Sequence, residues 1–183
     1  MVNILALDPG SVNFAWSIIT YRPDGKYKIT AAGMIQNVIN DLKIGMLPKG
    51  WLFHAEMEAL VKRFNIQEIV VERFMSRGSF GGGGMEAICL ELGIVLMVAE
   101  KEFMMLTSAS WKNAFNRLWP KKEYTLKDYY KERERGTPLH PIDASLMGIY
   151  YVEKFKLDVT PFQGFETKKR RDRIMGQICT HLA

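Results

Sequence analysis

Apolar residues in the first part of the chain occur in short runs that turn sequences separate. The run Ile4 to Leu7 ends at Asp8-Pro9-Gly10, and the run Phe14 to Tyr21 ends at Arg22-Pro23-Asp24-Gly25. A third run, Tyr27 to Ile35, follows that second turn. Short runs rich in β-branched and aromatic residues, joined by such turns, predict an antiparallel meander of three strands.

The rest of the chain alternates between helical and strand patterns. Apolar residues recur at helical spacing from Leu52 to Phe64, and nearly every face is apolar from Met85 to Lys101. The runs Ile69 to Val71 and Met104 to Thr107 predict two further strands. Three more helices are expected: from Ser108 or Ser110 to Trp119, an exposed one from Lys121 to Arg135, and a core helix from Pro141 to Lys154.

The order of these elements defines the expected fold. Residues 76–84 are so rich in glycine that a loop is expected, because glycine loses the most conformational freedom in a helix or strand. A meander followed by alternating helices and strands predicts an α/β fold, with a mixed five-stranded sheet flanked by helices. We expect one folded domain over residues 1–157 and a basic C-terminal extension over residues 158–183.

Composition narrows the possible partners and the compartment. The 183 residues include 25 Lys and Arg against 20 Asp and Glu, and a net charge of +5 favours nucleic acid over an anionic membrane as partner. Cys89 and Cys179 form no metal or redox motif, and Cys89 is expected in the core. The start of the chain does not resemble a signal peptide, and the longest apolar stretch, Ile94 to Ala99, is too short to span a bilayer. We therefore expect a cytoplasmic protein, in the host cytoplasm if the gene belongs to a phage.

Three carboxylates follow strands or open a helix where active sites of α/β proteins form. Asp8 comes directly after the first strand, Glu72 after the strand Ile69 to Val71, and Asp143 lies in the first turn of the last core helix. Each acid alone is more often a turn residue or a helix cap. Together they would repel one another and need a cation, and their oxygen ligands favour Mg²⁺ or Mn²⁺.

The sequences around these acids resemble the motifs of the RuvC-type Holliday-junction resolvases, which have the RNase H-like fold. The resemblance covers about residues 1–155 and departs from the family in the glycine-rich loop and the C-terminal tail. Its three motifs stand in the family's order: Leu7-Asp8-Pro9-Gly10-Ser11, Val70-Val71-Glu72-Arg73-Phe74 and His140-Pro141-Ile142-Asp143-Ala144.

This resemblance implies a structure-selective endodeoxyribonuclease that cleaves branched DNA. It implies two Mg²⁺ ions per site, with Mn²⁺ as a substitute, held by Asp8, Glu72, His140 and Asp143 as metal ligands and catalytic residues. His140 is expected either to bind the second ion or to help activate water. The resemblance also implies a homodimer, whose contact we assign to the apolar helix from Met85 to Lys101.

Side chains near the expected site are candidates for holding DNA. Basic side chains would contact phosphates, and an aromatic on the glycine-rich loop could stack on an unpaired base. Phe74 and Phe80 are alternatives for that second role. The candidates are Arg73, Phe74, Arg77, Ser79, Phe80, Lys112, Lys121 and Lys122.

Two other functions compete with a nuclease. An ATP-dependent phosphotransferase of the actin-like fold also begins its first hairpin with an Asp and a glycine, but Gly81 to Gly84 lacks the Lys and Ser or Thr of a phosphate-binding loop. A non-catalytic protein that binds branched DNA is the second alternative, and the presence of every candidate metal ligand argues against it.

Overall fold

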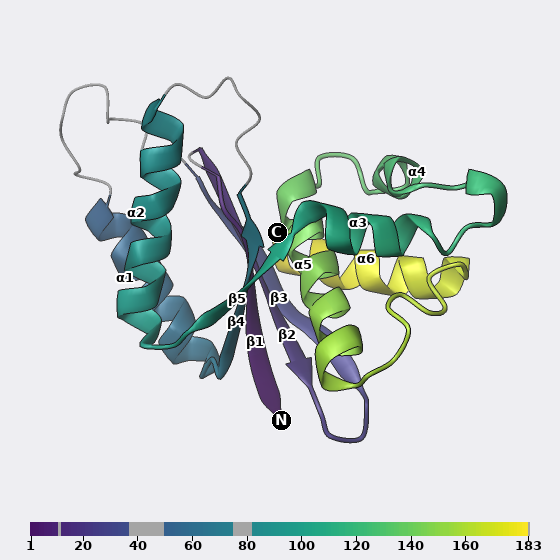
Figure 1. Cartoon of the computed structure of the whole chain (residues 1–183), viewed down its shortest axis with the longest axis horizontal. Coiled ribbons are helices and arrows are strands. Elements are labelled where there is room, and N and C mark those ends of the chain that lie inside the picture. The colour runs from purple at the N-terminus through teal and green to yellow at the C-terminus, as the bar shows by residue number, and fades with distance from the viewer. Residues whose placement is uncertain (11, 37–49, 75–81, 183) are drawn as a thin grey trace.

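The computed structural model describes residues 1–10, 12–36, 50–74 and 82–182. Within these ranges a five-stranded sheet lies between two layers of helices (Figure 1). The strand order is β3-β2-β1-β4-β5, and the bounds are β1 Val2–Asp8, β2 Asn13–Tyr21, β3 Tyr27–Gln36, β4 Glu68–Arg73 and β5 Phe103–Thr107. The expected mixed α/β sheet is confirmed, because β1, β2 and β3 pair antiparallel whereas β1, β4 and β5 pair parallel.

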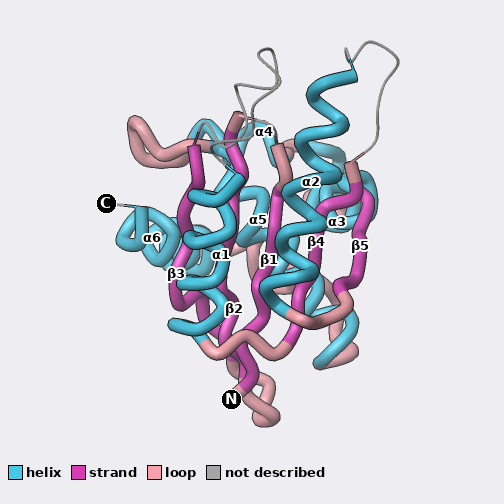
Figure 2. Tube along the Cα trace, turned by 90° about the vertical axis from the view of Figure 1, so that its left-hand side faces the viewer, coloured by secondary structure: helices cyan, strands magenta, loops and turns pink. Residues whose placement is uncertain are grey.

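Two helices cover one face of this sheet. In Figure 2, α1 (Gly50–Phe64) and α2 (Gly82–Ala99) lie in front of the strands and α5 (Leu139–Tyr151) lies behind them. Alternate residues of β1 and β4, such as Leu5, Leu7 and Val71, pack with α1 and α2 in one core cluster. The strands are therefore buried on both faces, as expected for parallel strands in an α/β protein.

The opposite face is covered by α5 and the helices that surround it. These are α3 (Ser108–Asn116), α4 (Leu126–Lys131) and α6 (Lys168–Leu182), with a 3₁₀ turn over Pro120–Lys122 and a π-helical turn over Val152–Lys156. Ala6 and Val70 point to this side and share a second core cluster with Ile142 and Leu146 of α5.

The close packing of α5 on the sheet depends on one glycine. A Cβ atom at Gly148 would lie 2.9 Å from the Cβ of Ala6 and 2.7 Å from Cγ1 of Ile19, so the helix could not approach as closely with any larger residue. About one turn earlier in α5, the Ser145 hydroxyl donates to the Ser17 hydroxyl at 2.9 Å. This approach brings the first turn of α5 to the end of β1.

Several predicted boundaries are wrong. The helix expected to end at Trp119 ends at Asn116, and Trp119 is extended, as residues before a proline usually are. Residues 121–135 form no exposed helix. They contain the short α4, whose Leu126 and Tyr129 are buried. A new helix starts there because Thr125 and Asp128 form a capping box.

The second apolar helix also differs from its prediction at both ends. It begins at Gly82, inside the segment expected to be a loop, and it ends at Ala99 because Glu100 has a positive φ of 51°. Intrinsic helix propensity is a weak preference that packing overrides, so three glycines can join a long apolar helix. Cys89, expected in the core, is exposed on this helix.

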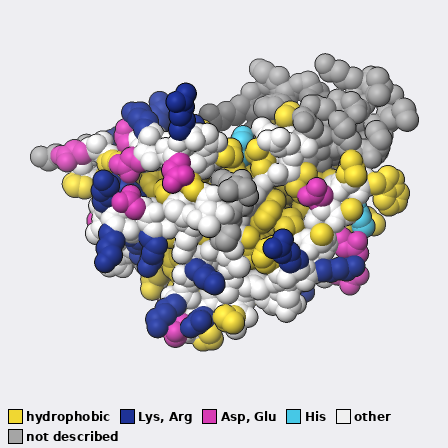
Figure 3. Space-filling view, turned by 180° about the vertical axis from the view of Figure 1, so that it is seen from behind, with side chains coloured by type: hydrophobic (Ala, Val, Ile, Leu, Met, Phe, Trp, Pro, Cys, Tyr) yellow, Lys and Arg dark blue, Asp and Glu magenta, His cyan; other side chains and the backbone are white. Residues whose placement is uncertain are grey.

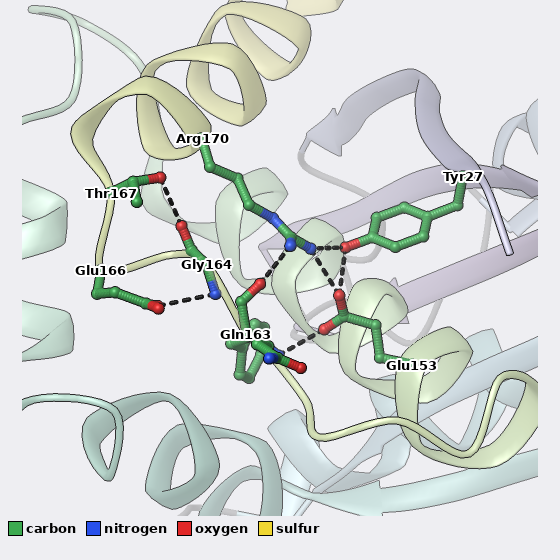
Figure 4. Close-up of polar contacts among 8 residues, drawn as sticks. Tyr27, Glu153, Gln163, Gly164, Glu166, Thr167 and Arg170 are labelled. Atoms are coloured by element: carbon green, nitrogen blue, oxygen red, sulfur yellow. Dashed lines mark hydrogen bonds and ion pairs between the residues drawn. The ribbon is translucent and has the colours of Figure 1, made fainter.

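The C-terminal segment is an ordered helix that joins the core. Ile174, Met175 and Ile178 of α6 are buried with residues of β3 and α5. Figure 4 shows how the start of α6 is attached: Arg170 donates to Glu153 of the π-helical turn at 2.6 Å and also to the Tyr27 hydroxyl of β3. Two of the basic residues of this tail, Arg170 and Arg171, therefore point into the protein.

Candidate active site

Asp8 is the last residue of β1, and Glu72 is the last residue but one of the adjacent parallel strand β4. The register pairs Leu7 with Val71, so the next residue on each strand is an acid. Side chains alternate along a strand, and Ala6 and Val70 point toward α5, so Asp8 and Glu72 point to that side as well. The two carboxylates are therefore placed next to each other by sheet register alone.

The first turn of α5 brings His140 and Asp143 to the same edge. Nδ1 of His140 lies 2.9 Å from Oδ2 of Asp8. A carboxylate oxygen accepts, so Nδ1 of His140 is the donor in this contact, and in the neutral imidazole the other ring nitrogen, Nε2, is an acceptor. The spacing of three residues puts His140 and Asp143 on one face of the helix.

Lys112 supplies a positive charge to this acidic cluster. Its Nζ lies 3.1 Å from Oδ2 of Asp143 and 4.8 Å from the centre of the Trp111 ring. The helix that carries it, α3, begins directly after β5, whose register pairs Thr107 with Arg73. The Lys112 ammonium is therefore held beside the end of β4, where Glu72 lies.

Two further residues contact the acids and were not identified from the sequence. Trp111 is fully buried and donates from Nε1 to Oε2 of Glu72 at 2.9 Å. Tyr130 of α4 donates its hydroxyl to Oδ1 of Asp143. Trp111 could have been identified from the sequence, because it adjoins the candidate residue Lys112. Tyr130 lies in a charged segment with no pattern that would single it out.

The surroundings raise the pKa of four groups in this cluster, Glu72, Asp143, His140 and Lys112. Burial raises the pKa of Glu72, and the charges of Asp8 and Asp143 raise it further. Burial likewise raises the pKa of Asp143, although Lys112 and Tyr130 act in the opposite direction. The hydrogen bond to Asp8 raises the pKa of His140. Burial lowers the pKa of Lys112, but the charges of Asp143 and Glu72 outweigh it and the net shift is upward.

Carboxylate oxygens are the ligands that a hard cation takes in proteins. Carboxylates that repel one another in a partly buried place suit Mg²⁺ or Mn²⁺. Among the residues that the structure describes, however, no three His, Cys, Asp or Glu side chains converge closely enough to hold a metal ion. Each acid is instead occupied by a partner from the protein: His140 on Asp8, Trp111 on Glu72, and Lys112 with Tyr130 on Asp143.

The candidate DNA-binding residues are only partly described. Arg73 is exposed at the end of β4, Phe74 after it is half-buried, and Lys122 is exposed on the 3₁₀ turn. Arg77, Ser79 and Phe80 lie outside the described residues, as does the side chain of Lys121. Seen from behind, the visible Lys and Arg side chains gather mostly on the half of the molecule formed by α3 to α6 (Figure 3).

Comparison with known proteins identifies the architecture. No protein-family model matches the chain, and no curated protein matches it by sequence. Among solved structures, Thermus thermophilus RuvC aligns with a TM-score of 0.60 at 14% identity, over 87% of this chain and 99% of the other. The chain has the RuvC fold.

Two further solved structures share this fold. RuvC of the same organism in complex with a Holliday junction substrate gives a TM-score of 0.59 at 15% identity, over 88% of this chain and 100% of the other. The yeast mitochondrial Holliday junction resolvase Ydc2 gives 0.53 at 17% identity, over 79% of this chain and 75% of the other. The resemblance to the RuvC fold expected from the three motifs is thereby confirmed.

In the part of the chain that the structure describes, no helix combines the length and apolarity needed to cross a bilayer.

Proposed function

We propose that this protein is a metal-dependent endonuclease that cleaves four-way junctions or other branched DNA. The observation that carries the proposal is the cluster of Asp8, Glu72 and Asp143 beside Lys112, at the carboxyl ends of β1 and β4. The RuvC fold supports it, because two of the similar structures are named as Holliday junction resolvases or hold a junction. Neither an ATP-dependent phosphotransferase nor a binding protein without activity accounts for three acids and His140 gathered at one edge of the sheet.

Asp8, Glu72 and Asp143 are the residues that would hold Mg²⁺, with Mn²⁺ as a substitute and two ions per site. When bound, the ions supply an activated water and stabilise the leaving oxygen of the phosphodiester. Glu72 would be held by the buried indole of Trp111. Asp143 would be held by Lys112 and Tyr130.

His140 and Lys112 take different parts in this proposal. Nδ1 of His140 donates to Asp8, which fixes the ring and leaves Nε2 to accept a proton from water or to hold a cation. The Lys112 ammonium balances the negative charge of the acids before DNA arrives and can contact a phosphate once it has arrived.

Branched DNA would be held by basic side chains around the cluster. Arg73 and Lys122 are exposed, and Lys112 is part of the cluster itself. Arg77, Ser79, Phe80 and Lys121 stay candidates from the sequence. We also propose a homodimer, since two sites related by a two-fold axis could cut opposite strands of a junction symmetrically.

Three variants test the assignment of the acids. Asp8→Asn, Glu72→Gln and Asp143→Asn should each abolish cleavage of a four-way junction and leave its binding largely intact, because phosphate contacts come from other residues. Glu58→Gln, an exposed acid on α1, is the matched control and should cut at the wild-type rate. Full activity in one of the three variants would remove that residue from the site.

A further inference from the structure

Both oxygens of the Asp143 carboxylate are occupied by groups from different elements. Lys112 of α3 contacts Oδ2 at 3.1 Å, and the Tyr130 hydroxyl of α4 donates to Oδ1. The Asp143 side chain is only 15% exposed, so these two contacts determine which way its oxygens face. A tyrosine hydroxyl carries a proton at neutral pH and a carboxylate oxygen accepts, so Tyr130 is the donor in this hydrogen bond.

The position of Tyr130 depends on how α4 is fixed. Its neighbour Tyr129 and the first residue, Leu126, are buried in the core, and the Leu126 amide donates to Oδ1 of Asn116 at 2.8 Å. The start of the helix is fixed by the capping box of Thr125 and Asp128. A helix of six residues is too short to be stable alone, so contacts at its other end also matter.

The C-terminal helix supplies a contact at that other end. Arg171 of α6 donates from Nε to Oε2 of Glu132 at 3.1 Å, two residues beyond Tyr130. The guanidinium also lies over the rings of Trp119 and Tyr124, at 5.5 Å and 4.6 Å from their centres. Such stacking on aromatic faces favours arginine over lysine.

Arg171 is itself held firmly. Its Nη1 donates to the carbonyl oxygens of Phe165 and Glu166, both at 3.2 Å. The adjacent Arg170 is tied to Glu153 and Tyr27, as Figure 4 shows. A continuous set of contacts therefore runs from the sheet through α6 and Glu132 to the helix that carries Tyr130.

We infer that Tyr130 is a positioning residue that orients the Asp143 carboxylate for cleavage, and that the C-terminal helix keeps it in place through Arg171 and Glu132. The inference rests on the proposed nuclease function. It gives the residues beyond the last core helix a part in the reaction that does not require them to contact DNA.

Tyr130→Phe removes the hydroxyl and leaves the ring, and it has a matched control next to it. The Tyr129 hydroxyl is buried and has no hydrogen-bond partner among the described residues. Tyr130→Phe should lower kcat for junction cleavage by about tenfold or more, the range expected for a lost hydrogen bond to a charged group, and leave KM unchanged. Tyr129→Phe should change neither constant. A Tyr130→Phe protein that cleaves at the wild-type rate would overturn the inference.

The part of α6 is tested at Glu132, whose side chain is 41% exposed. When Glu132 is replaced, Arg171 keeps its two carbonyl partners and its contacts with the two aromatic rings. Glu132→Ala should lower kcat by a smaller factor than Tyr130→Phe, and Glu134→Ala, an exposed neighbour, should not lower it. Since Glu132 acts through Tyr130, it should have no further effect when combined with Tyr130→Phe. Factors that multiply in the double variant would show that Glu132 acts elsewhere and would overturn the role of α6.

Thermal unfolding separates this inference from a loss of fold, and the cleavage assays separate it from a failure of the proposed function. Thermal unfolding of each variant shows whether a lower kcat reflects loss of fold, because a purely structural role would lower the Tm together with the fraction of active protein. If the wild-type protein cleaves no branched DNA, the proposed function fails. If the wild type cleaves and Asp143→Asn does not, while Tyr130→Phe is fully active, only the inference about Tyr130 fails.

Discussion

The indole nitrogen of Trp111 donates a hydrogen bond of 2.9 Å to Oε2 of Glu72. The Trp111 ring is fully buried in the core between the sheet and α3, so the donor is fixed by packing. This contact links the hydrophobic core directly to an acid of the candidate active site. The ammonium of the neighbouring Lys112 lies over the same ring.

Trp111→Phe should therefore impair cleavage more than binding. The variant keeps an aromatic side chain in the core but leaves Glu72 without its donor, and a lost hydrogen bond to a charged group is worth about 1.5 to 3 kcal/mol. We expect the single-turnover rate to fall at least tenfold. Trp51→Phe, at a position on α1 that is 77% exposed, is the control. Equal rates for the two variants would contradict this role of Trp111.

Lys112→Gln should destabilise the protein in the absence of divalent cations. The ammonium lies 3.1 Å from Asp143, and its charge opposes part of the rise that burial causes in the pKa of Asp143 and of Glu72, so its loss leaves the acids to repel one another. Because Lys112 is partly exposed, we expect a loss of about 1 to 3 kcal/mol in the free energy of unfolding. Urea unfolding at pH 7 with a chelator measures it, with Lys127→Gln as the control. Added Mg²⁺ should raise the Tm of Lys112→Gln more than that of the wild type, and an equal rise would count against a cation site here.

Glu91 should make the protein less stable as the pH rises. Both its carboxylate oxygens are buried without a hydrogen-bond partner in the described part of the chain, and burial raises its pKa from 4.5 to about 8. The folded protein therefore binds a proton that the unfolded chain has released, so stability falls between pH 4.5 and about 8 and levels off above that.

Glu91→Leu should remove this pH dependence and raise stability. At pH 7 and above we expect a gain on the order of 3 kcal/mol, since each pKa unit corresponds to about 1.4 kcal/mol. Denaturant unfolding from pH 5 to pH 9 measures it for the wild type, Glu91→Leu and the exposed control Glu86→Leu. Parallel curves for the wild type and Glu91→Leu would show that Glu91 is ionised in the folded state.

The proposed dimer has a specific surface to test. Met85, Cys89 and Leu96 are exposed on one face of α2, and Met97, which points away from that face, is 76% exposed. Large exposed apolar patches usually mark contacts. Sedimentation at micromolar concentration should give twice the chain mass for the wild type and the chain mass for Met97→Glu. Leu52→Glu, an exposed position on α1, should remain dimeric. A monomeric wild type that still makes paired nicks would contradict the dimer.

The strands and the acids could be predicted from the sequence because their signals are local. Asp8 and Glu72 each follow an apolar run, and strand pairing alone brings them together. Tyr130 and Arg171 could not be predicted in the same way. Their positions depend on contacts between segments that are 13 and 39 residues apart in the chain, in regions dominated by charge. The C-terminal helix was missed because its first turn is the basic run Lys168 to Arg171 and only a few apolar residues follow it.

Cleavage of a four-way junction beside a linear duplex of the same sequence tests the central claim most directly. The wild-type protein should cut the junction in Mg²⁺ or Mn²⁺ and leave it intact with a chelator, and it should leave the duplex largely uncut under both conditions. Asp8→Asn should bind the junction without cutting it in any of these buffers. Equal cutting of junction and duplex, cutting that survives the chelator, or an active Asp8→Asn protein would contradict a metal-dependent, branch-selective nuclease built on these acids.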